Sequence, residues 1–261
     1  MSKNNPYDGR GRILTQSGGS GCGCTKQIVE RTRPYVWVPH SCALSPWNAQ
    51  KFCNLLKGRK VLLIGDSTMQ QTASVLMNAI QWRQGGCQKD IFCAMADTLV
   101  HRSFGSHNRG LVWTEWVAKI LPDIVVISAG AHIKKDSDFD QVISEVVKDI
   151  QVLKDKNPKV TVVWKTQQPG GCFPQVTDEI WNASTWAKYP GKRYNWPLFY
   201  DRDVRVKQIM RQNAIPVIDL KMLYYRGDAH RGRHDCLHMC IPGPLDIFAV
   251  LFQNFLETSN P

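Results

Sequence analysis

The sequence predicts an α/β fold with a parallel central sheet, because short apolar runs alternate with amphipathic segments along most of the chain. Four runs have the length and composition of buried strands: 61–64, 123–128, 159–164 and 215–219. Helical spacing of apolar residues marks the segments 69–82, 138–154, 201–212 and 244–256. In such sheets ligands bind at the carboxyl ends of the strands.

The composition is that of one globular domain. The 261 residues are 43% hydrophobic and 10% aromatic, which is enough to bury a substantial core. The first residues are rich in Gly, Ser and Asn, so we expect a flexible arm over 1–30 and a single catalytic domain over 31–261. No apolar run reaches the roughly 18 residues that a membrane span needs, so no integral membrane segment is predicted.

The net charge of +11 favours anionic partners in general. The basic residues are scattered, however, and no motif of a nucleic-acid reader is present, so we predict no nucleic-acid partner.

Nine cysteines favour disulfides and an oxidising compartment, the Golgi lumen or the cell exterior. None of the close pairs has the Cys-x-x-Cys spacing of a zinc site, and no metal is predicted. The glycosylation sequon at Asn182 agrees with a lumenal location. No signal peptide is visible in the first 30 residues, which keeps a cytoplasmic location open.

A candidate nucleophile follows the first predicted strand. The run Gly-Asp-Ser at 65–67 ends the strand, and Ser67 is placed where the following helix begins, near its positive end. Asp66 is expected to order the turn through backbone N–H groups instead of taking part in chemistry. The alternative is that Ser67 is only a helix N-cap, a position that favours serine.

A candidate base lies far downstream, at His238. A serine needs a base to remove its proton, and the base needs a carboxylate on its other ring nitrogen. Asp235 is three residues before His238, so one helical turn or a tight loop can join their side chains. We therefore predict Ser67, His238 and Asp235 as a catalytic triad, against the alternative of a structural Asp–His pair.

The oxyanion of an ester intermediate also needs hydrogen-bond donors. The candidates are the backbone N–H of Ser67, the turn at Gly86, and the small-residue stretch after the second strand, which contains Ser128, Gly130 and His132. His132 is equally well explained as an ordinary loop residue.

Aromatic residues are dense between 166 and 200, where the periodicity is lost. Aromatic faces suit sugar rings, and the alternative is a satellite core. The residues are Trp181, Trp186, Tyr189, Tyr194, Trp196 and Tyr200.

Four motifs resemble the PC-esterase branch of the GDSL/SGNH hydrolases, which includes the trichome-birefringence-like, neurexophilin-and-PC-esterase and sialate O-acetyltransferase proteins. They are WVPHSC at 37–42, GRKVLLIGDS at 58–67, KT followed by GGC over 165–172, and DCLHMCIPGP at 235–244. The last is the most specific, because glycine and proline directly follow the Asp-Cys-x-His-x-Cys pattern. The resemblance covers about residues 35–257, with unmatched stretches inside.

The resemblance implies a three-layer α/β/α SGNH-hydrolase-like fold with a mostly parallel sheet. It implies an O-acyltransferase, most simply an O-acetyltransferase, that acts on carbohydrate hydroxyls through an acyl-serine intermediate. A carbohydrate O-acetyl esterase with the same triad is the alternative, and an inactive glycan-binding module is a second. The partner is then a glycan or polysaccharide. No cofactor is expected, and an acetyl ester or acetyl-CoA is a possible acyl donor; no oligomeric state is predicted.

The sequence departs from this family at three points. Plant members usually have Asn at the position of Ser128, so the oxyanion donors differ. A family cysteine is replaced by Asn78, and the membrane anchor of many relatives is not visible. Among the cysteines, the resemblance implies structural disulfides that brace the catalytic loop, with the candidates Cys42, Cys172, Cys236 and Cys240.

Overall fold

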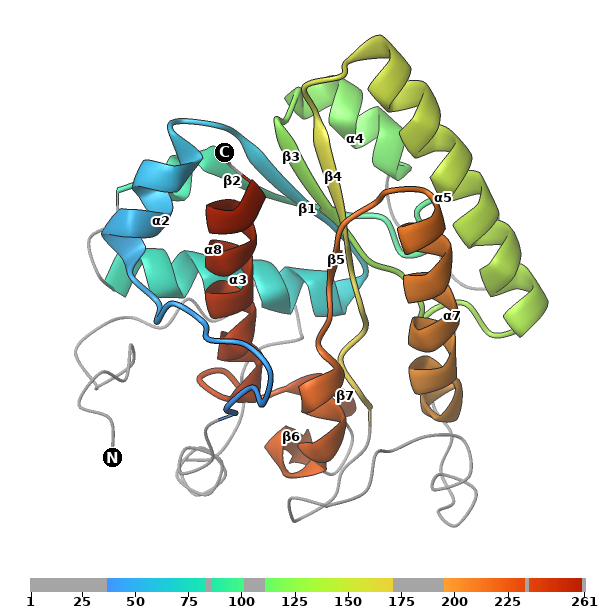
Figure 1. The fold of residues 1–261 in the computed structure, drawn as a ribbon. Coiled ribbons are helices and arrows are strands. Elements are labelled where there is room, and N and C mark those ends of the chain that lie inside the picture. Colours follow the sequence, from blue (N-terminus) through green and yellow to red (C-terminus); the bar gives the residue numbers. More distant parts are fainter. Residues whose placement is uncertain (1–36, 83–85, 101–110, 171–194, 233–234, 260–261) are drawn as a thin grey trace.

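A five-stranded parallel sheet forms the centre of the computed structural model, which describes residues 37–82, 86–100, 111–170, 195–232 and 235–259 (Figure 1). The strand order is β2-β1-β3-β4-β5, and every neighbouring pair is parallel. The strands are β1 (Val61–Gly65), β2 (Ile91–Met95), β3 (Ile124–Ile127), β4 (Thr161–Lys165) and β5 (Val217–Ile218). The arm predicted over 1–30 lies outside the described residues.

Helices cover both faces of this sheet. One face packs against α2 (Ala49–Leu56), α3 (Ser67–Trp82) and α8 (Ile247–Ser259). The other face packs against α4 (Trp113–Ile120), α5 (Asp136–Lys156) and α7 (Phe199–Gln212). Alternate residues of each strand enter the two cores, as the pleat requires. The predicted three-layer α/β/α architecture is confirmed.

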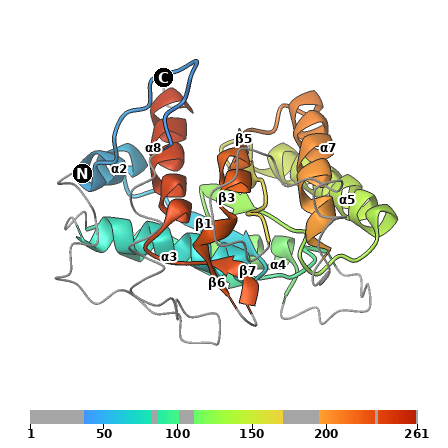
Figure 2. The same ribbon diagram turned by 90° about the horizontal axis from the view of Figure 1, so that it is seen from below.

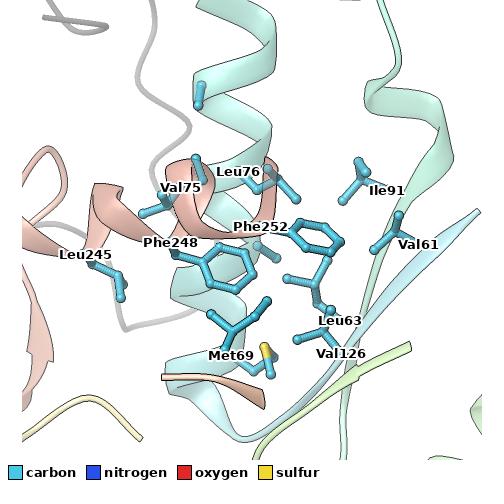
Figure 3. Close-up of a cluster of buried hydrophobic side chains, with 14 of the residues drawn as sticks. Val61, Leu63, Met69, Val75, Leu76, Ile91, Val126, Leu245, Phe248 and Phe252 are labelled. Carbon is cyan, nitrogen blue, oxygen red and sulfur yellow. The ribbon is translucent and has the colours of Figure 1, made fainter. Parts of the chain in front are cut away.

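The core beneath α3 and α8 is apolar and closely packed (Figure 3). The rings of Phe248 and Phe252 stack at 5.6 Å between centroids, and both side chains are fully buried. Met69 and Leu63 lie under them in the same cluster. Each buried side chain of this size contributes roughly 1.5 to 3 kcal/mol, so this packing fixes the start of α3 against the sheet.

A two-stranded antiparallel hairpin lies outside the main sheet and contacts α3 (Figure 2). It consists of β6 (His230–Gly232) and β7 (Asp235–Met239). Five short 3-10 segments complete the described fold: Gln88–Asp90, Trp196–Leu198, Lys221–Tyr225, Gly227–Ala229 and Pro244–Asp246. In the ranges that the structure describes, no helix combines the length and apolar character of a membrane span.

The sequence did not predict β2, α2 or α4, and it started α3 two residues late. Strand β2 lies at the sheet edge and has a mixed burial pattern, with Cys93 exposed. Helices α2 and α4 have eight residues each, which gives few repeats of a helical pattern. Short elements at the periphery therefore carry too little periodicity to be recognised.

Candidate active site

Ser67 lies where β1 ends and α3 begins, at the carboxyl edge of the sheet. The chain leaves the sheet at Gly65, where a Cβ would collide with the backbone carbonyl oxygen of Ser128. The carboxylate of Asp66 then accepts the backbone N–H and the hydroxyl of Thr68 at 2.8 and 2.7 Å. The turn-ordering role predicted for Asp66 is confirmed, and Ser67 becomes the first residue of a helix whose amino end favours negative charge.

His238 and Asp235 belong to the strand β7, and not to a helical turn. In a regular strand, residues three apart point to opposite faces. The pairing of β7 with β6 is irregular, however, because paired positions are two residues apart on β6 and four apart on β7. The carboxylate of Asp235 also accepts the backbone N–H groups of Leu237 and His238 at 3.3 and 3.1 Å. This local bulge turns both side chains to the same side.

The three side chains form a continuous chain of hydrogen bonds. The Nε2 atom of His238 lies 2.7 Å from the hydroxyl oxygen of Ser67. The Nδ1 atom of the same ring lies 3.0 Å from both carboxylate oxygens of Asp235. An ionised carboxylate can only accept, so Nδ1 carries the proton of the neutral ring and Nε2 accepts from the serine hydroxyl. The residues predicted for the triad are thus in contact, and their catalytic role is a proposal developed below.

The electrostatics of Asp235 agree with this assignment of protons. Burial opposes its ionisation, but the hydrogen bond and charge of His238, with the backbone N–H groups of His238 and Leu237, lower its pKa to about 2. The carboxylate is therefore charged at every physiological pH. A fixed negative charge beside Nδ1 stabilises the imidazolium that forms when Nε2 takes a proton.

Three of the predicted oxyanion residues follow β3, which pairs directly with β1. The backbone N–H of Ser128 donates to the carbonyl of Ile64 at 3.2 Å, and its side chain is buried. Gly130 lies against the amide of Gln167, which occupies the space that a side chain would need. His132 is partly exposed. These residues lie at the same edge of the sheet as Ser67, and their part in oxyanion binding stays a prediction.

Gly86 lies at the opposite end of the sheet, so its predicted role as an oxyanion donor is wrong. Helix α3 runs back across the sheet for 16 residues, about 24 Å, before the chain reaches Gly86. The next residue, Cys87, forms a disulfide with Cys53 of α2. Gly86 therefore precedes the amino end of β2, whereas Ser67 follows the carboxyl end of β1.

The loop after β2, and not the turn at Gly86, lies at the edge of the sheet that carries Ser67. The backbone N–H of Ala96 donates to the carbonyl of Gly65 at 2.8 Å, which continues the pairing of the two strands. The buried carboxylate of Asp97 lies 3.9 Å from Nε2 of His132. The sequence missed this loop because it missed β2, and the apolar run at 91–95 was the signal that could have revealed it.

Buried titratable side chains support the end of β4 and the residue after it, where the predicted Lys-Thr motif lies. Lys165 is fully buried, and burial lowers its pKa to about 8 although Asp66 and Asp203 act in the opposite direction. Burial raises the pKa of Asp203 to about 7, although this carboxyl accepts the N–H of Gln167 and the hydroxyl of Tyr224. These contacts hold the end of β4 beside the site. Asp203 was missed because it lies in an otherwise ordinary helical pattern.

The described aromatic residues of the 166–200 stretch pack within the protein. Trp196 is buried in a small cluster with Phe199 and Tyr224, and Tyr200 packs against the same cluster. For these two residues the satellite-core alternative holds. The other aromatic side chains predicted for sugar contact lie outside the described residues: Trp181, Trp186, Tyr189 and Tyr194.

The cysteine predictions have mixed outcomes. Cys236 and Cys240, which flank His238, both form disulfides, as predicted. Cys42 is a free and exposed thiol, so its predicted disulfide is wrong. Cys172 lies outside the described residues. The sequence did not predict the bond between Cys53 and Cys87, because spacing along a chain does not reveal which thiols meet in space.

No protein-family model matches this chain. A curated relative is the protein trichome birefringence-like 39 of Arabidopsis thaliana, which is 23% identical. The alignment covers 86% of this chain and 76% of that protein, so the similarity spans most of both sequences.

Solved structures show the same fold. A crystal structure of an acetyl xylan esterase matches with a TM-score of 0.50 and 16% identity, over 77% of this chain and all of that one. The periplasmic domain of a lipopolysaccharide acetyltransferase of Salmonella ser. Paratyphi A matches with a TM-score of 0.50 and 14% identity. That match covers 81% of this chain and 98% of the domain.

Proposed function

For a chain whose motifs, sequence relative and fold support the PC-esterase and SGNH-like family, we propose a serine-dependent O-acyltransferase that acts on carbohydrate hydroxyls. The acyl group is most simply acetyl. The observation that carries the proposal is the 2.7 Å contact between the Ser67 hydroxyl and His238 Nε2, with Asp235 at 3.0 Å on the other side of the ring.

The reaction proceeds by double displacement. His238 Nε2 takes the Ser67 proton while the hydroxyl oxygen attacks the carbonyl carbon of the donor ester. The tetrahedral intermediate collapses, and the leaving oxygen or sulfur of the donor takes the proton from His238. An acceptor sugar hydroxyl then gives its proton to His238 and attacks the acyl carbon. The bond from that carbon to the Ser67 oxygen breaks, the Ser67 oxygen takes the proton back from His238, and the acylated sugar leaves.

The donor is consumed in this scheme, so an acetyl ester or acetyl-CoA is a substrate, and we propose no bound cofactor or metal. A glycan acceptor is supported by the two structural neighbours, because one is an esterase of acetyl xylan and the other an acetyltransferase of lipopolysaccharide.

Hydrolysis of carbohydrate acetyl esters is the second candidate, favoured by the likeness to an acetyl xylan esterase. The same residues serve if water takes the place of the sugar hydroxyl in the second step. The outcome depends on how well the acyl-enzyme is shielded from water.

Mass spectrometry after incubation with an activated acetate ester tests the proposal. We expect one acetyl group on Ser67, lost in Ser67→Ala and kept in the control Ser74→Ala, whose serine lies on the same helix and donates to the backbone carbonyl of Gln70. If the folded wild-type protein never acquires the acetyl label, the enzymatic function is refuted and the glycan-binding module is favoured. Adding polysaccharides to the labelled protein, and comparing free acetate with acetylated sugar, separates transferase from esterase.

A further inference from the structure

A buried glutamine links the helix that carries Ser67 to the strand that carries His238. Gln71 follows Ser67 by four residues, so the two side chains lie on the same face of α3, one turn apart. The Gln71 amide nitrogen donates to the carbonyl of Met239 at 2.7 Å. Its amide oxygen accepts the backbone N–H of Met239 at 3.0 Å. The amide therefore pairs with β7 as a neighbouring strand residue would.

A second glutamine extends this contact to the other side of His238. The side-chain nitrogen of Gln168 donates to the amide oxygen of Gln71 at 3.0 Å and to the carbonyl of Leu237 at 3.2 Å. The residues directly before and after His238 are thus both bonded to this pair of amides. Gln71 and Gln168 are 1% and 0% exposed, so water does not compete for these bonds.

Among the described residues, β7 has one strand partner, β6. The backbone N–H and carbonyl of Met239 bond to Gln71 of α3 and not to β6. The catalytic geometry requires a contact of 2.7 Å between His238 Nε2 and Ser67 Oγ. A shift of β7 along α3 by about 1 Å would break that contact, and such misplacements slow enzymes by roughly 100-fold. The two bonds of the Gln71 amide join α3 directly to the residue after His238, and so hold this register.

We propose that Gln71 is a positioning residue which, with Gln168, holds His238 at reacting distance from Ser67; the inference rests on the acyl-serine function proposed above. Gln71 does not touch the reacting atoms, so its effect is on the rate of acyl transfer and not on ester binding.

The test compares Gln71→Met with Gln253→Met. Gln253 is a matched control, because it is fully buried and its amide likewise joins a helix to a backbone, accepting from Asn48 N–H at 2.8 Å and donating to Pro46 O at 3.0 Å. In Gln71→Met we expect the limiting rate of Ser67 acetylation to fall roughly 100-fold, with the half-saturating ester concentration unchanged. In Gln253→Met we expect the wild-type rate.

Hydrogen exchange of the Met239 amide gives a readout independent of chemistry. It should accelerate in Gln71→Met and stay at the wild-type rate in Gln253→Met. If wild-type protein labels and folded Gln71→Met labels equally fast, the positioning role is overturned and the acyl-serine function stands. If the wild-type protein is never acetylated, the proposed acyl-serine function is refuted. If, in addition, the Met239 amide exchanges at the wild-type rate in Gln71→Met, the hydrogen bond between Gln71 and Met239 is refuted as well.

If Gln71→Met does not fold, Gln168→Met is tested in its place. That substitution removes the donor to the Leu237 carbonyl and leaves both bonds between Gln71 and Met239. A fall of roughly 10-fold or more in the limiting rate supports the inference. A wild-type rate in that variant overturns it.

Discussion

Replacing Asp235 with asparagine probes the proton path with little change of shape. The amide oxygen of the new side chain would still accept the backbone N–H of His238, as the carboxylate does at 3.1 Å. Its NH2 group would then face Nδ1 of the ring, and the proton would move from Nδ1 to Nε2. Nε2 would donate to Ser67 when it should accept, so we expect the Asp235→Asn protein to acetylate Ser67 about 1,000- to 10,000-fold more slowly.

The same substitution has a smaller effect on stability. The pKa of Asp235 is lowered from 3.8 to about 2 in the folded chain. At about 1.4 kcal/mol per pKa unit, this difference sets an upper limit of about 2.5 kcal/mol on what the half-buried, ionised carboxylate contributes to the free energy of unfolding. Because the folded pKa is the lower one, this contribution is complete above pH 3.8 and is lost as the pH falls toward 2. Asp235→Asn should therefore cost at most about 2.5 kcal/mol at pH 7.

The assay is the rate of ester-dependent acetylation, followed by intact mass, beside urea unfolding at pH 7. Asp246→Asn is the control, because its carboxylate also accepts a backbone N–H, that of Gly243 at 3.1 Å, within the adjacent turn. A labelling rate of Asp235→Asn within about tenfold of wild type would refute this proton path.

Three further substitutions have defined outcomes. Burial lowers the pKa of His230 to about 4 from 6.5, so the free energy of unfolding should fall by up to about 3 kcal/mol as the pH drops from 6.5 toward 4. Urea unfolding of His230→Gln should show a smaller loss of stability over the same pH range. Equal acid sensitivity of the two proteins would contradict this. Gly65→Ala should cost about 1 to 3 kcal/mol in thermal unfolding, since the new methyl group meets the Ser128 carbonyl; wild-type stability would show that the strands can separate. The Cys53–Cys87 disulfide closes a loop whose ends are 34 positions apart, and removing it should lower the stability by about 3 to 4 kcal/mol in the same assay. An unchanged unfolding transition would show that the disulfide does not stabilise the fold.

The central part of the fold could be predicted because its signals are local. Strand β1 is buried at every position, and its apolar run ends at a glycine that the close approach of Ser128 requires. Parallel strands place their carboxyl ends at one edge, so a serine after β1 was expected at a ligand site before any contact was known. The contact with His238, 171 positions away, follows from that placement together with the downstream motif.

The parts that could not be predicted depend on tertiary contacts. Asp235 and His238 meet through a bulged strand, although their spacing suggested a turn, because pairing with β6 overrides the local pattern. Gly86 lies at the other end of the sheet from Ser67, and the sequence could not show this because a glycine in a turn does not indicate which edge of a sheet the turn occupies. The glutamine contact between Gln71 and Met239 was also invisible, because a polar residue in a helix normally faces solvent.

The two halves of the site are held by different forces, and this sets how each responds to substitution. Ser67 is fixed through α3, whose Met69 lies in the apolar core, and apolar burial is not directional. In the strand of His238 only Leu237 and Met239 are buried, and the register of this strand against α3 depends on the hydrogen bonds of Gln71, which weaken steeply with distance and angle. Substitutions along the interface of α3 and β7 should therefore slow the chemistry before they unfold the sheet, whereas substitutions in β1 should do both together.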